Sequence, residues 1–214
     1  MNMGIWLGVA MMATAGGSAA AETVVTLPAP QMVGGMPLMQ ALSSRHSTRE
    51  FSDRALPLQT LSDLLWAAAG VNRADSGKRT APSARDWREI DVYVTKADGA
   101  YRYDAKANVL RLVAARDLRE LTGSQDFVAT APVNLVYVAD VQRMRGASPE
   151  QRDLYLGADT GFIAQNVYLY CASARLATVV RGSVDRAVLA KALGLSPHQQ
   201  ITLAQTVGYP KQAR

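Results

Sequence analysis

The segment Pro149–Leu176 reads PEQRDLYLGADTGFIAQNVYLYCASARL and is long and periodic enough to form a helix of several turns. Its apolar side chains recur between polar residues, which is typical of a helix that packs against a core. These apolar positions include Leu156, Phe162, Ala164, Val167 and Leu169. The single cysteine, Cys171, lies in the same apolar setting and is expected to be a buried small hydrophobe. We therefore expect this helix to cross the centre of the domain.

Shorter periodic segments lie on both sides of this helix in the sequence. Further helices are predicted over Pro37–Ser44, Pro57–Val71 and Val184–Leu193. Strands are predicted over Ile90–Val94, Tyr101–Tyr103, Val109–Val113, Val133–Val138, Ala177–Val180 and Gln200–Gly208. The polar segment Asn72–Lys78 is predicted to be a loop. Because helices and strands mix without a regular repeat, the sequence predicts an α+β fold with a mostly antiparallel sheet surrounded by helices.

The length and composition of the chain suit one compact domain. It has 214 residues, of which 49% are hydrophobic and 19% charged, and this is enough for a single sizeable core. We expect the domain to occupy residues 37–214. Residues 22–36 are rich in proline and glycine and are predicted to form an extended N-terminal arm.

The first 21 residues carry no charged side chain and contain the apolar run Gly4–Met12. Ala19–Ala21 has the form of a signal-peptidase site, so residues 1–21 are predicted to be a signal peptide cleaved after Ala21. The run is too short to span a membrane, and no membrane span is expected in the mature chain. The protein is thus expected to be exported to the periplasm. The alternative is a disordered leader rich in alanine and methionine.

Charge and missing motifs narrow the function classes. The net charge of +5 comes from basic residues scattered among acidic ones, which disfavours nucleic acid as a partner. The two histidines, His46 and His198, and the one cysteine have no metal-ligand spacing, so no metal site is predicted. The sequence lacks the usual signatures of serine hydrolases, Rossmann dehydrogenases and P-loop NTPases.

The turn Ser44–Phe51, which reads SRHSTREF, follows the first predicted helix and holds two guanidiniums, an imidazole and three hydroxyls. Arginine forks, hydroxyls and backbone N–H groups are the donors that bind phosphate oxygens. A phosphate site at this turn is one interpretation. The other is a solvated basic loop that binds no ligand.

Three more segments accompany this turn, namely Arg79–Ala84 (RTAPSA), Leu176–Gly182 (LATVVRG) and Thr206–Lys211 (TVGYPK). With them the chain resembles the nitroreductase family of FMN flavoproteins from residue 37 to residue 211. It is most similar to the branch of azoline-forming dehydrogenases, the SagB/McbC-type oxidoreductases. The resemblance implies a nitroreductase-like fold, FMN as cofactor, and a homodimer that binds each FMN between its subunits.

The resemblance also assigns residues to the phosphate end of the site. Arg45, Ser47 and Arg49 match contacts to the FMN phosphate and ribityl chain. His46 lies between them, where a contact to the ribityl chain and a helix-end role without any cofactor are both open. Lys211 is expected either to close the phosphate pocket or to be a free lysine of the tail.

Two other segments match the surroundings of the flavin ring. The loop expected to lie along the ring consists of Pro82, Ser83 and Ala84. The opposite wall, from which a backbone amide approaches N5 of the ring in the family, consists of Val180, Arg181 and Gly182. Val180 is alternatively no more than a buried strand residue.

The chain departs from the family pattern at two places. Arg85 and Asp86 stand where relatives have glycine followed by asparagine or alanine. Asp86 is expected to accept the flavin N3–H, and its charge would lower the reduction potential of the flavin. Arg181 stands where close relatives have an aliphatic residue, and it is expected to offset Asp86, to bind an acidic substrate or to point to solvent.

The expected function is that of an FMN-dependent oxidoreductase that transfers hydride through flavin N5 to or from a small organic substrate. No side chain is assigned a catalytic role, because such enzymes rely on the positioning of the cofactor. The electron donor, NAD(P)H or another, stays open. Two alternatives are a thiazoline or oxazoline dehydrogenase of peptide tailoring, and a dimer that binds flavin or another anionic ligand without turnover.

Overall fold

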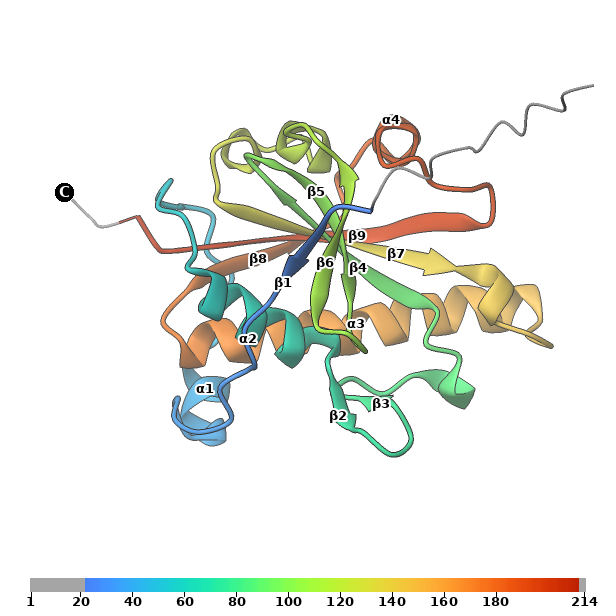
Figure 1. Cartoon of the computed structure of the whole chain (residues 1–214), viewed down its shortest axis with the longest axis horizontal. Coiled ribbons are helices and arrows are strands. Elements are labelled where there is room, and N and C mark those ends of the chain that lie inside the picture. The colour runs from blue at the N-terminus through green and yellow to red at the C-terminus, as the bar shows by residue number, and fades with distance from the viewer. Residues whose placement is uncertain (1–21, 212–214) are drawn as a thin grey trace, which may run out of the picture.

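The structure, a computed structural model, describes residues 22–211, so the predicted signal peptide lies outside the described residues. The chain forms a seven-stranded sheet in which every neighbouring pair of strands is antiparallel (Figure 1). In spatial order the strands are β1 (Val24–Thr26), β6 (Val109–Ala114), β5 (Gly99–Asp104), β4 (Ile90–Lys96), β7 (Val133–Asp140), β9 (Gln199–Gly208) and β8 (Ala177–Arg181). This architecture confirms the predicted α+β fold.

The central strands of the sheet are buried on both faces, because a core cluster packs against each face. Along β4, Ile90, Val92 and Val94 belong to one core cluster and Tyr93 belongs to the other. This division follows from the two-residue period of side chains along a strand. It explains why the central strands read as almost continuous apolar runs.

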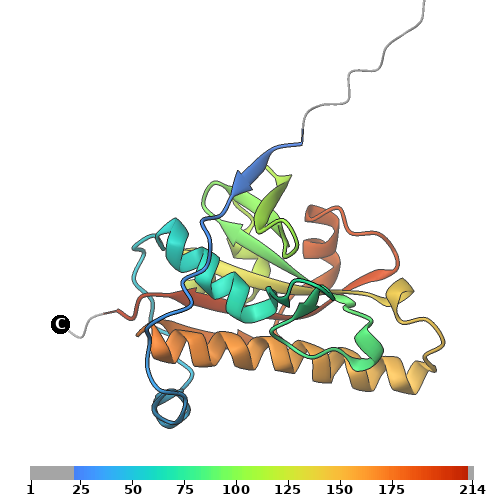
Figure 2. The same ribbon diagram turned by 60° about the horizontal axis from the view of Figure 1, so that its bottom comes forward.

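Helices cover the two faces unequally. α2 (Leu58–Ala69) and α3 (Pro149–Ser173) pack together on one face, and α4 (Arg186–Ala192) and the 3-10 helix η2 (Arg119–Thr122) cover the other (Figures 1 and 2). α1 (Leu38–Ser44) packs on α3, on the side away from the sheet (Figure 2). Three short 3-10 helices complete the fold: η1 (Ala84–Asp86), η3 (Asp126–Val128) and η4 (Val141–Arg143). None of the helices in residues 22–211 combines the length and apolar character that a membrane span needs.

α3 confirms the predicted central helix, although it ends at Ser173 rather than Leu176. A capping box fixes its first turn. In this box Gln151 N–H donates to Ser148 Oγ, and Ser148 N–H donates to the Gln151 side chain. Beyond the C-terminal end, Arg175 adopts a left-handed conformation with φ of 57°, which an α-helix does not continue.

α3 carries apolar side chains on two faces. Leu156, Ile163 and Val167 are buried in the core, and so is Cys171, as the sequence predicted. Burial raises the pKa of the Cys171 thiol, so it is an unreactive packing residue. Phe162, in contrast, is 46% exposed on the face that points away from the sheet.

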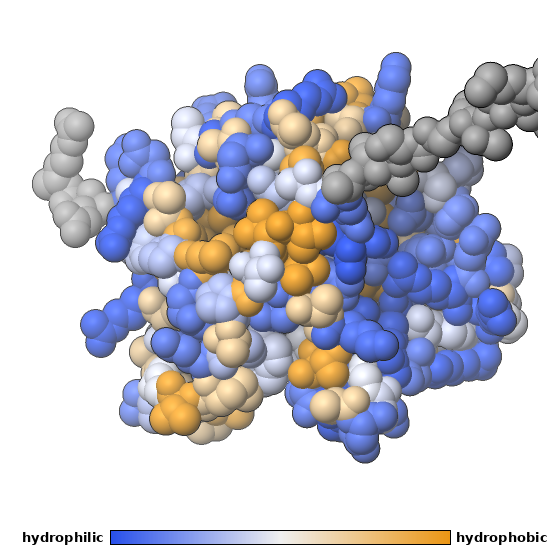
Figure 3. Space-filling model, viewed as in Figure 1, coloured by the Kyte–Doolittle hydropathy of each residue, from blue (hydrophilic) through white to orange (hydrophobic). Residues whose placement is uncertain are grey.

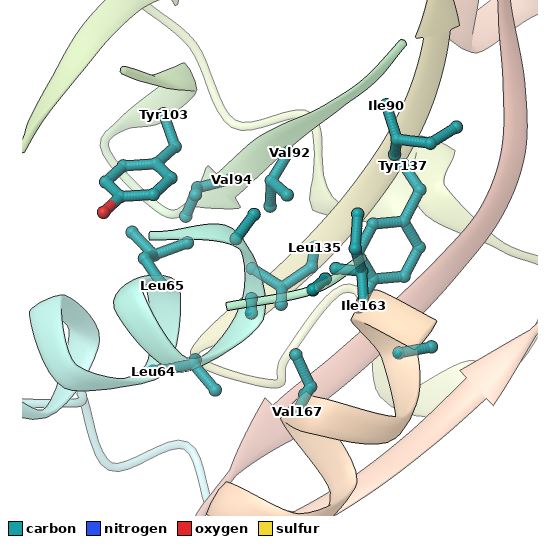
Figure 4. Close-up of a cluster of buried hydrophobic side chains, with 14 of the residues drawn as sticks. Leu64, Leu65, Ile90, Val92, Val94, Tyr103, Leu135, Tyr137, Ile163 and Val167 are labelled. Atoms are coloured by element: carbon teal, nitrogen blue, oxygen red, sulfur yellow. The ribbon is translucent and has the colours of Figure 1, made fainter. Parts of the chain in front are cut away.

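The core between the sheet and the helices α2 and α3 is built from aliphatic side chains and tyrosines (Figure 4). Leu64 and Leu65 enter it from α2. Tyr137 of β7 is wholly buried, and its hydroxyl donates to Gln205 Oε1 at 2.6 Å. Gln205 in turn donates to Thr178 Oγ1 at 3.1 Å, so these buried polar groups have partners.

The N-terminal arm contains β1, a strand that the sequence did not predict. Val24 lies opposite Arg111 of β6, and the Glu22 carboxylate accepts from the Arg111 guanidinium at 2.7 Å. Further along the arm, Ser62 Oγ on α2 donates to Pro28 O at 2.6 Å. Near its end, Met36 N–H donates to Ser173 Oγ at 2.7 Å, so the arm is bound to the domain along its length.

The predicted loop over residues 72–78 needs correction. β2 (Val71–Arg73) and β3 (Lys78–Arg79) pair as a small antiparallel ribbon around this segment. The prediction rested on polarity, and an exposed ribbon can be as polar as a loop because it buries little of either face. α2 correspondingly ends at Ala69 rather than Val71, since Gly70 has extended backbone.

The last predicted helix also begins later than expected. α4 starts at Arg186 instead of Val184, because the Asp185 carboxylate accepts from Val188 N–H at 3.1 Å and caps the helix there.

Replacing Leu65 by alanine tests the placement of α2 in the core. Leu65 is fully buried, whereas Leu58 on the same helix is 42% exposed. We expect Leu65→Ala to lower the free energy of unfolding by about 2–5 kcal/mol through the cavity it leaves, and Leu58→Ala by less than about 1 kcal/mol. Urea denaturation followed by circular dichroism measures both losses, and equal losses would contradict this placement.

Candidate functional site

Tyr168 of α3 joins two of the predicted site segments. Its hydroxyl lies 2.7 Å from Ser47 Oγ and accepts from Val180 N–H at 3.0 Å. The Arg45 guanidinium lies over the Tyr168 ring, 5.3 Å from the ring centroid. We call these four residues the Tyr168 cluster. It brings together Arg45, Ser47 and Val180, three residues that the sequence assigned to one site.

Backbone pairing holds the basic turn beside β8 and the C-terminal segment. Thr48 N–H donates to Thr178 O at 2.9 Å, and Lys211 N–H donates to Glu50 O at 3.2 Å. The first bond holds the turn against β8, and the second holds the backbone of Lys211 beside the turn. Because main-chain groups help to fix the turn, an exposed side chain such as that of Arg49 remains available for a ligand.

The outer side of the turn is exposed and basic. Arg49 and His46 are both exposed, and His46 Nδ1 lies 2.8 Å from Ser44 O at the end of α1. This contact agrees with the helix-end interpretation of His46. Lys211 also lines a shallow cleft together with Arg54, Arg175 and Asp53, so the lining of this cleft is positive on balance.

The proline-serine-alanine loop lies at a second place, over a cavity of about 300 Å³. Ala84 N–H donates to Asp159 Oδ2 at 2.9 Å, and Ser83 Oγ donates to Glu89 Oε2 at 3.1 Å. We call these four residues the loop cluster. The remaining polar lining of the cavity comes from Arg73, Lys78, Arg79, Asp86 and Arg88.

The departure at Arg85 and Asp86 is visible in the backbone. Arg85, Asp86 and Arg88 have φ of 50°, 56° and 51°, in the left-handed region that glycine enters without cost. A non-glycine residue there stores about 1 kcal/mol of strain. This chain therefore builds a left-handed turn from residues whose side chains carry charge.

The Asp86 carboxylate is already bound within this turn. It accepts two hydrogen bonds from Arg88, from Nε at 2.7 Å and from Nη2 at 2.6 Å. The hydrogen bond from Arg88 lowers the pKa of Asp86, so the group stays ionised at neutral pH. Its charge is balanced by Arg88, and the expectation that Arg181 offsets it is wrong.

Arg181 does not point to solvent, which corrects a second expectation. Only 6% of the residue is exposed, and its guanidinium donates to Thr122 O at 2.6 Å and to Asn134 Oδ1 at 3.0 Å. Burial without a carboxylate partner lowers the pKa of Arg181 to about 10, so the side chain is still charged at neutral pH. The guanidinium is enclosed by neutral acceptors, so the side chain also has no free surface for an acidic substrate. Its role is to anchor the segment that contains η2 to the sheet.

The structure separates the two clusters on one chain. Asp159 and Tyr168 are nine residues apart on α3, which corresponds to about 13 Å along the helix axis. Arg45, Ser47 and Val180 therefore lie together, whereas Pro82, Ser83 and Ala84 lie at the other half of α3.

Sequence reasoning missed three residues of these clusters. Tyr168 sits in an apolar run and reads as a core residue, and Glu89 and Asp159 are 70 positions apart in the sequence. The available signal was weak. A tyrosine or a carboxylate placed within an apolar stretch requires a polar partner once it is buried.

Comparisons with known proteins agree with the fold and the motifs. The nitroreductase family model matches residues 42–209. A crystal structure from Ralstonia eutropha JMP134, provisionally named a nitroreductase, is 49% identical and covers 89% of this chain and 90% of its own, with a TM-score of 0.85. A relative from Methanocaldococcus jannaschii, provisionally named a nitroreductase, is 31% identical over 68% of this chain and 78% of its own.

Two more distant structures share the fold. One, from Desulfovibrio desulfuricans, is provisionally named a nitroreductase and was solved in complex with FMN; it is 22% identical, with a TM-score of 0.60, over 83% of this chain and 88% of its own. The other is the E. coli microcin synthetase McbBCD complex with truncated pro-MccB17 bound, 19% identical, with a TM-score of 0.69, over 94% of this chain and 85% of its own. The family match covers most of the chain and agrees with the two relatives above that are 49% and 31% identical, and the protein therefore belongs to the nitroreductase family.

Proposed function

We propose that the protein is an FMN-dependent oxidoreductase that moves hydride between flavin N5 and a small organic substrate. The observation that carries this proposal is the Tyr168 cluster, where the basic turn, β8 and α3 meet in a member of the nitroreductase family. The Desulfovibrio desulfuricans structure supports the choice of FMN, because that protein shares the fold and was solved with this cofactor.

The donor set beside the basic turn suits the phosphate of FMN. Arg45 and Arg49 supply guanidiniums, Ser47 supplies a hydroxyl, and Lys211, whose backbone pairs with Glu50, supplies an ammonium. Phosphate oxygens accept best from charged donors of this kind, and bidentate arginine contacts add geometric selectivity. No metal is needed to bind such a group at this place.

Bound FMN would supply a ring that accepts and returns two electrons. The residues of the chain bind and orient that ring. The small side chains of Ser83 and Ala84 permit close approach from one side, and the backbone of β8 near Val180 and Gly182 provides the opposite wall. Held geometry of this kind is the main contribution a protein makes to hydride transfer.

A second copy of the chain completes the proposed site. Atoms in contact are about 3.5 Å apart, so two walls that enclose one flat ring are separated by about 7 Å. The loop at Ala84 and the wall at Val180 are attached to α3 at positions about 13 Å apart along the helix. One chain therefore presents them too far apart, and we place the ring between the wall of one subunit and the loop of its partner.

The exposed face of α3 suits this dimer. Leu154 is 64% exposed and Phe162 is 46% exposed, and a Cβ atom added to Gly157 or Gly161 would meet nothing within 4 Å. The two glycines are thus not needed for packing within the chain, but they allow a second helix to approach closely.

α1 extends the apolar surface beside α3. Leu38 and Met39 are 62% and 75% exposed, and Figure 3 shows apolar side chains gathered over α1 at its lower left. Exposed apolar groups that lie together mark interaction surfaces.

We also propose that the mature protein acts in the periplasm, on the basis of the signal-like sequence of residues 1–21. NAD(P)H is a cytoplasmic metabolite, so an exported enzyme needs another electron donor. The substrate class of the azoline-dehydrogenase branch remains a second candidate, supported by the fold shared with the McbBCD complex. Binding of flavin without turnover is a third, supported by the charged turn at Arg85 and Asp86.

Replacing Arg45 and Ser47 together by alanine tests the phosphate assignment. We expect FMN to bind more weakly by about 2–4 kcal/mol, because one charge-assisted and one polar contact are lost. Quenching of flavin fluorescence measures the affinity, and circular dichroism checks the fold. Arg116→Ala is the matched control, since Arg116 is an exposed arginine after β6. Unchanged affinity in the folded double variant would refute the assignment.

Replacing Phe162 by aspartate tests the dimer. A charge at the centre of an apolar interface should raise the dissociation constant of the dimer at least about 30-fold, or ~2 kcal/mol. Val188→Asp is the control, because Val188 on α4 is similarly exposed, at 48%. Analytical ultracentrifugation should show that only the Phe162 variant dissociates. A wild-type monomer at all concentrations would remove the dimer from the proposal.

A further inference from the structure

Glu89 and Asp159 form a buried carboxyl pair at the cavity beneath the proline-serine-alanine loop. Glu89 is fully buried just before β4, and Asp159 on α3 is 2% exposed. Each holds one residue of the loop: Glu89 Oε2 accepts from Ser83 Oγ at 3.1 Å, and Asp159 Oδ2 accepts from Ala84 N–H at 2.9 Å. Together they hold two consecutive residues of the loop, Ser83 by its side chain and Ala84 by its backbone N–H.

The pair lacks the partners that two carboxylates would require. Glu89 Oε1 is buried and has no hydrogen-bond donor among the described residues. Within residues 22–211, no lysine or arginine forms an ion pair with Glu89 or Asp159. Two adjacent buried carboxylates without a cation repel each other and lack the solvation of water. A proton on Glu89 Oε1 removes one charge and supplies the missing hydrogen, which Asp159 can accept.

We propose that Glu89 and Asp159 share one proton, and that this neutral–anionic pair is the positioning device for the loop that lies along the flavin ring. Its role in positioning rests on the proposed function. Glu89 is thus a positioning residue: in its neutral form it donates to Asp159, and Asp159 remains an acceptor for Ala84 N–H. Loss of the shared proton places two negative charges side by side, and their repulsion pushes apart the two carboxylates that hold Ser83 and Ala84.

The electrostatic setting supports a retained proton. Burial, together with the neighbouring Asp159, raises the pKa of Glu89 from its ordinary value of 4.5 to about 7, and the hydrogen bond from Ser83 opposes this rise. Charged groups also surround the cavity, and these are Asp86, Arg88, Arg73, Lys78 and Arg79. Arg88 is engaged with Asp86, and Asp91 near the start of β4 is paired with Arg143. Arg79 has its own pKa lowered by burial, with no contribution from Glu89.

The sign of the effect on stability follows from the raised pKa. The folded chain binds a proton at Glu89 up to about pH 7, while the unfolded chain releases it near pH 4.5. The proton on Glu89 therefore stabilises the folded state fully below pH 4.5, and this stabilisation is lost as the pH rises through about 7. Between pH 5 and pH 8 the unfolding equilibrium constant of the wild type should rise by about 100-fold from this group alone.

The test compares the full-length wild type with Glu89→Gln, in which an amide replaces the neutral acid and still donates to Asp159. Urea denaturation without FMN is measured from pH 5 to pH 8, with Glu120→Gln, an exposed glutamate of η2, as the control. We expect the unfolding equilibrium constants of the wild type and Glu120→Gln to rise with pH to the same extent. The rise for Glu89→Gln should be about 100-fold smaller, because the proton of Glu89 is absent from this variant. Parallel curves for all three proteins would overturn the shared proton.

The positioning role has its own readout, the dissociation constant of FMN at pH 6 and pH 8. The wild type should bind FMN about tenfold more weakly at pH 8 once the pair is ionised, whereas Glu89→Gln should bind equally at both values. Asp159→Asn, which also removes the charge pair, should flatten the dependence in the same way. Equal pH dependence in wild type and variants would overturn the positioning role. Absence of FMN binding would overturn the proposed function and this role together, while the unfolding curves still decide whether a proton is shared.

Discussion

The packing of α3 against the sheet is the constraint on which both clusters depend. Its buried face carries Leu156, Ile163 and Val167 into the core, and this contact fixes the rotation and the position of the helix. Asp159 and Tyr168 are half a turn out of phase and lie at the two edges of that face. One helix therefore turns a carboxylate toward the loop and a phenol toward β8, and neither can move without the other.

The charges of Asp86 and Arg181, which depart from the family pattern, are bound by separate groups of the chain. Asp86 finds its counter-ion two residues away, in Arg88, within one exposed turn. Arg181 finds neutral acceptors at Thr122 and Asn134 on the far side of the wall. Because the two charges are not paired with each other, each departure changes only its own surroundings, and the backbone wall near Val180 keeps its contact with Tyr168.

Much of the fold could be predicted because its central elements are long and strongly periodic. The central helix and the strands β4, β7 and β9 follow from apolar patterns alone, and the basic turn is recognisable because its donors are contiguous in the sequence. The three-residue strand β1 is too short to leave a pattern. Its pairing with β6 is decided by residues more than 80 positions away.

The missed site residues share one cause. The roles of a buried tyrosine and two buried carboxyls depend on neighbours that are brought together only in the folded chain. Tyr168 looks like core in the sequence because its ring is core, and only its hydroxyl reaches Ser47 and Val180. The same holds for Arg181, whose burial depends on acceptors in the segment around η2 and on β7.

β1 has a consequence for how the chain reaches this fold. It covers the outer side of β6, which without it would be an open sheet edge able to recruit a strand from another molecule. β6 also lies far from β1 in the sequence, so this pairing requires closure of a long loop and belongs to the late steps of folding. Until the N-terminal arm docks, the folding chain exposes the edge of β6, which is prone to aggregation. The few residues of β1 then protect this edge by pairing with it.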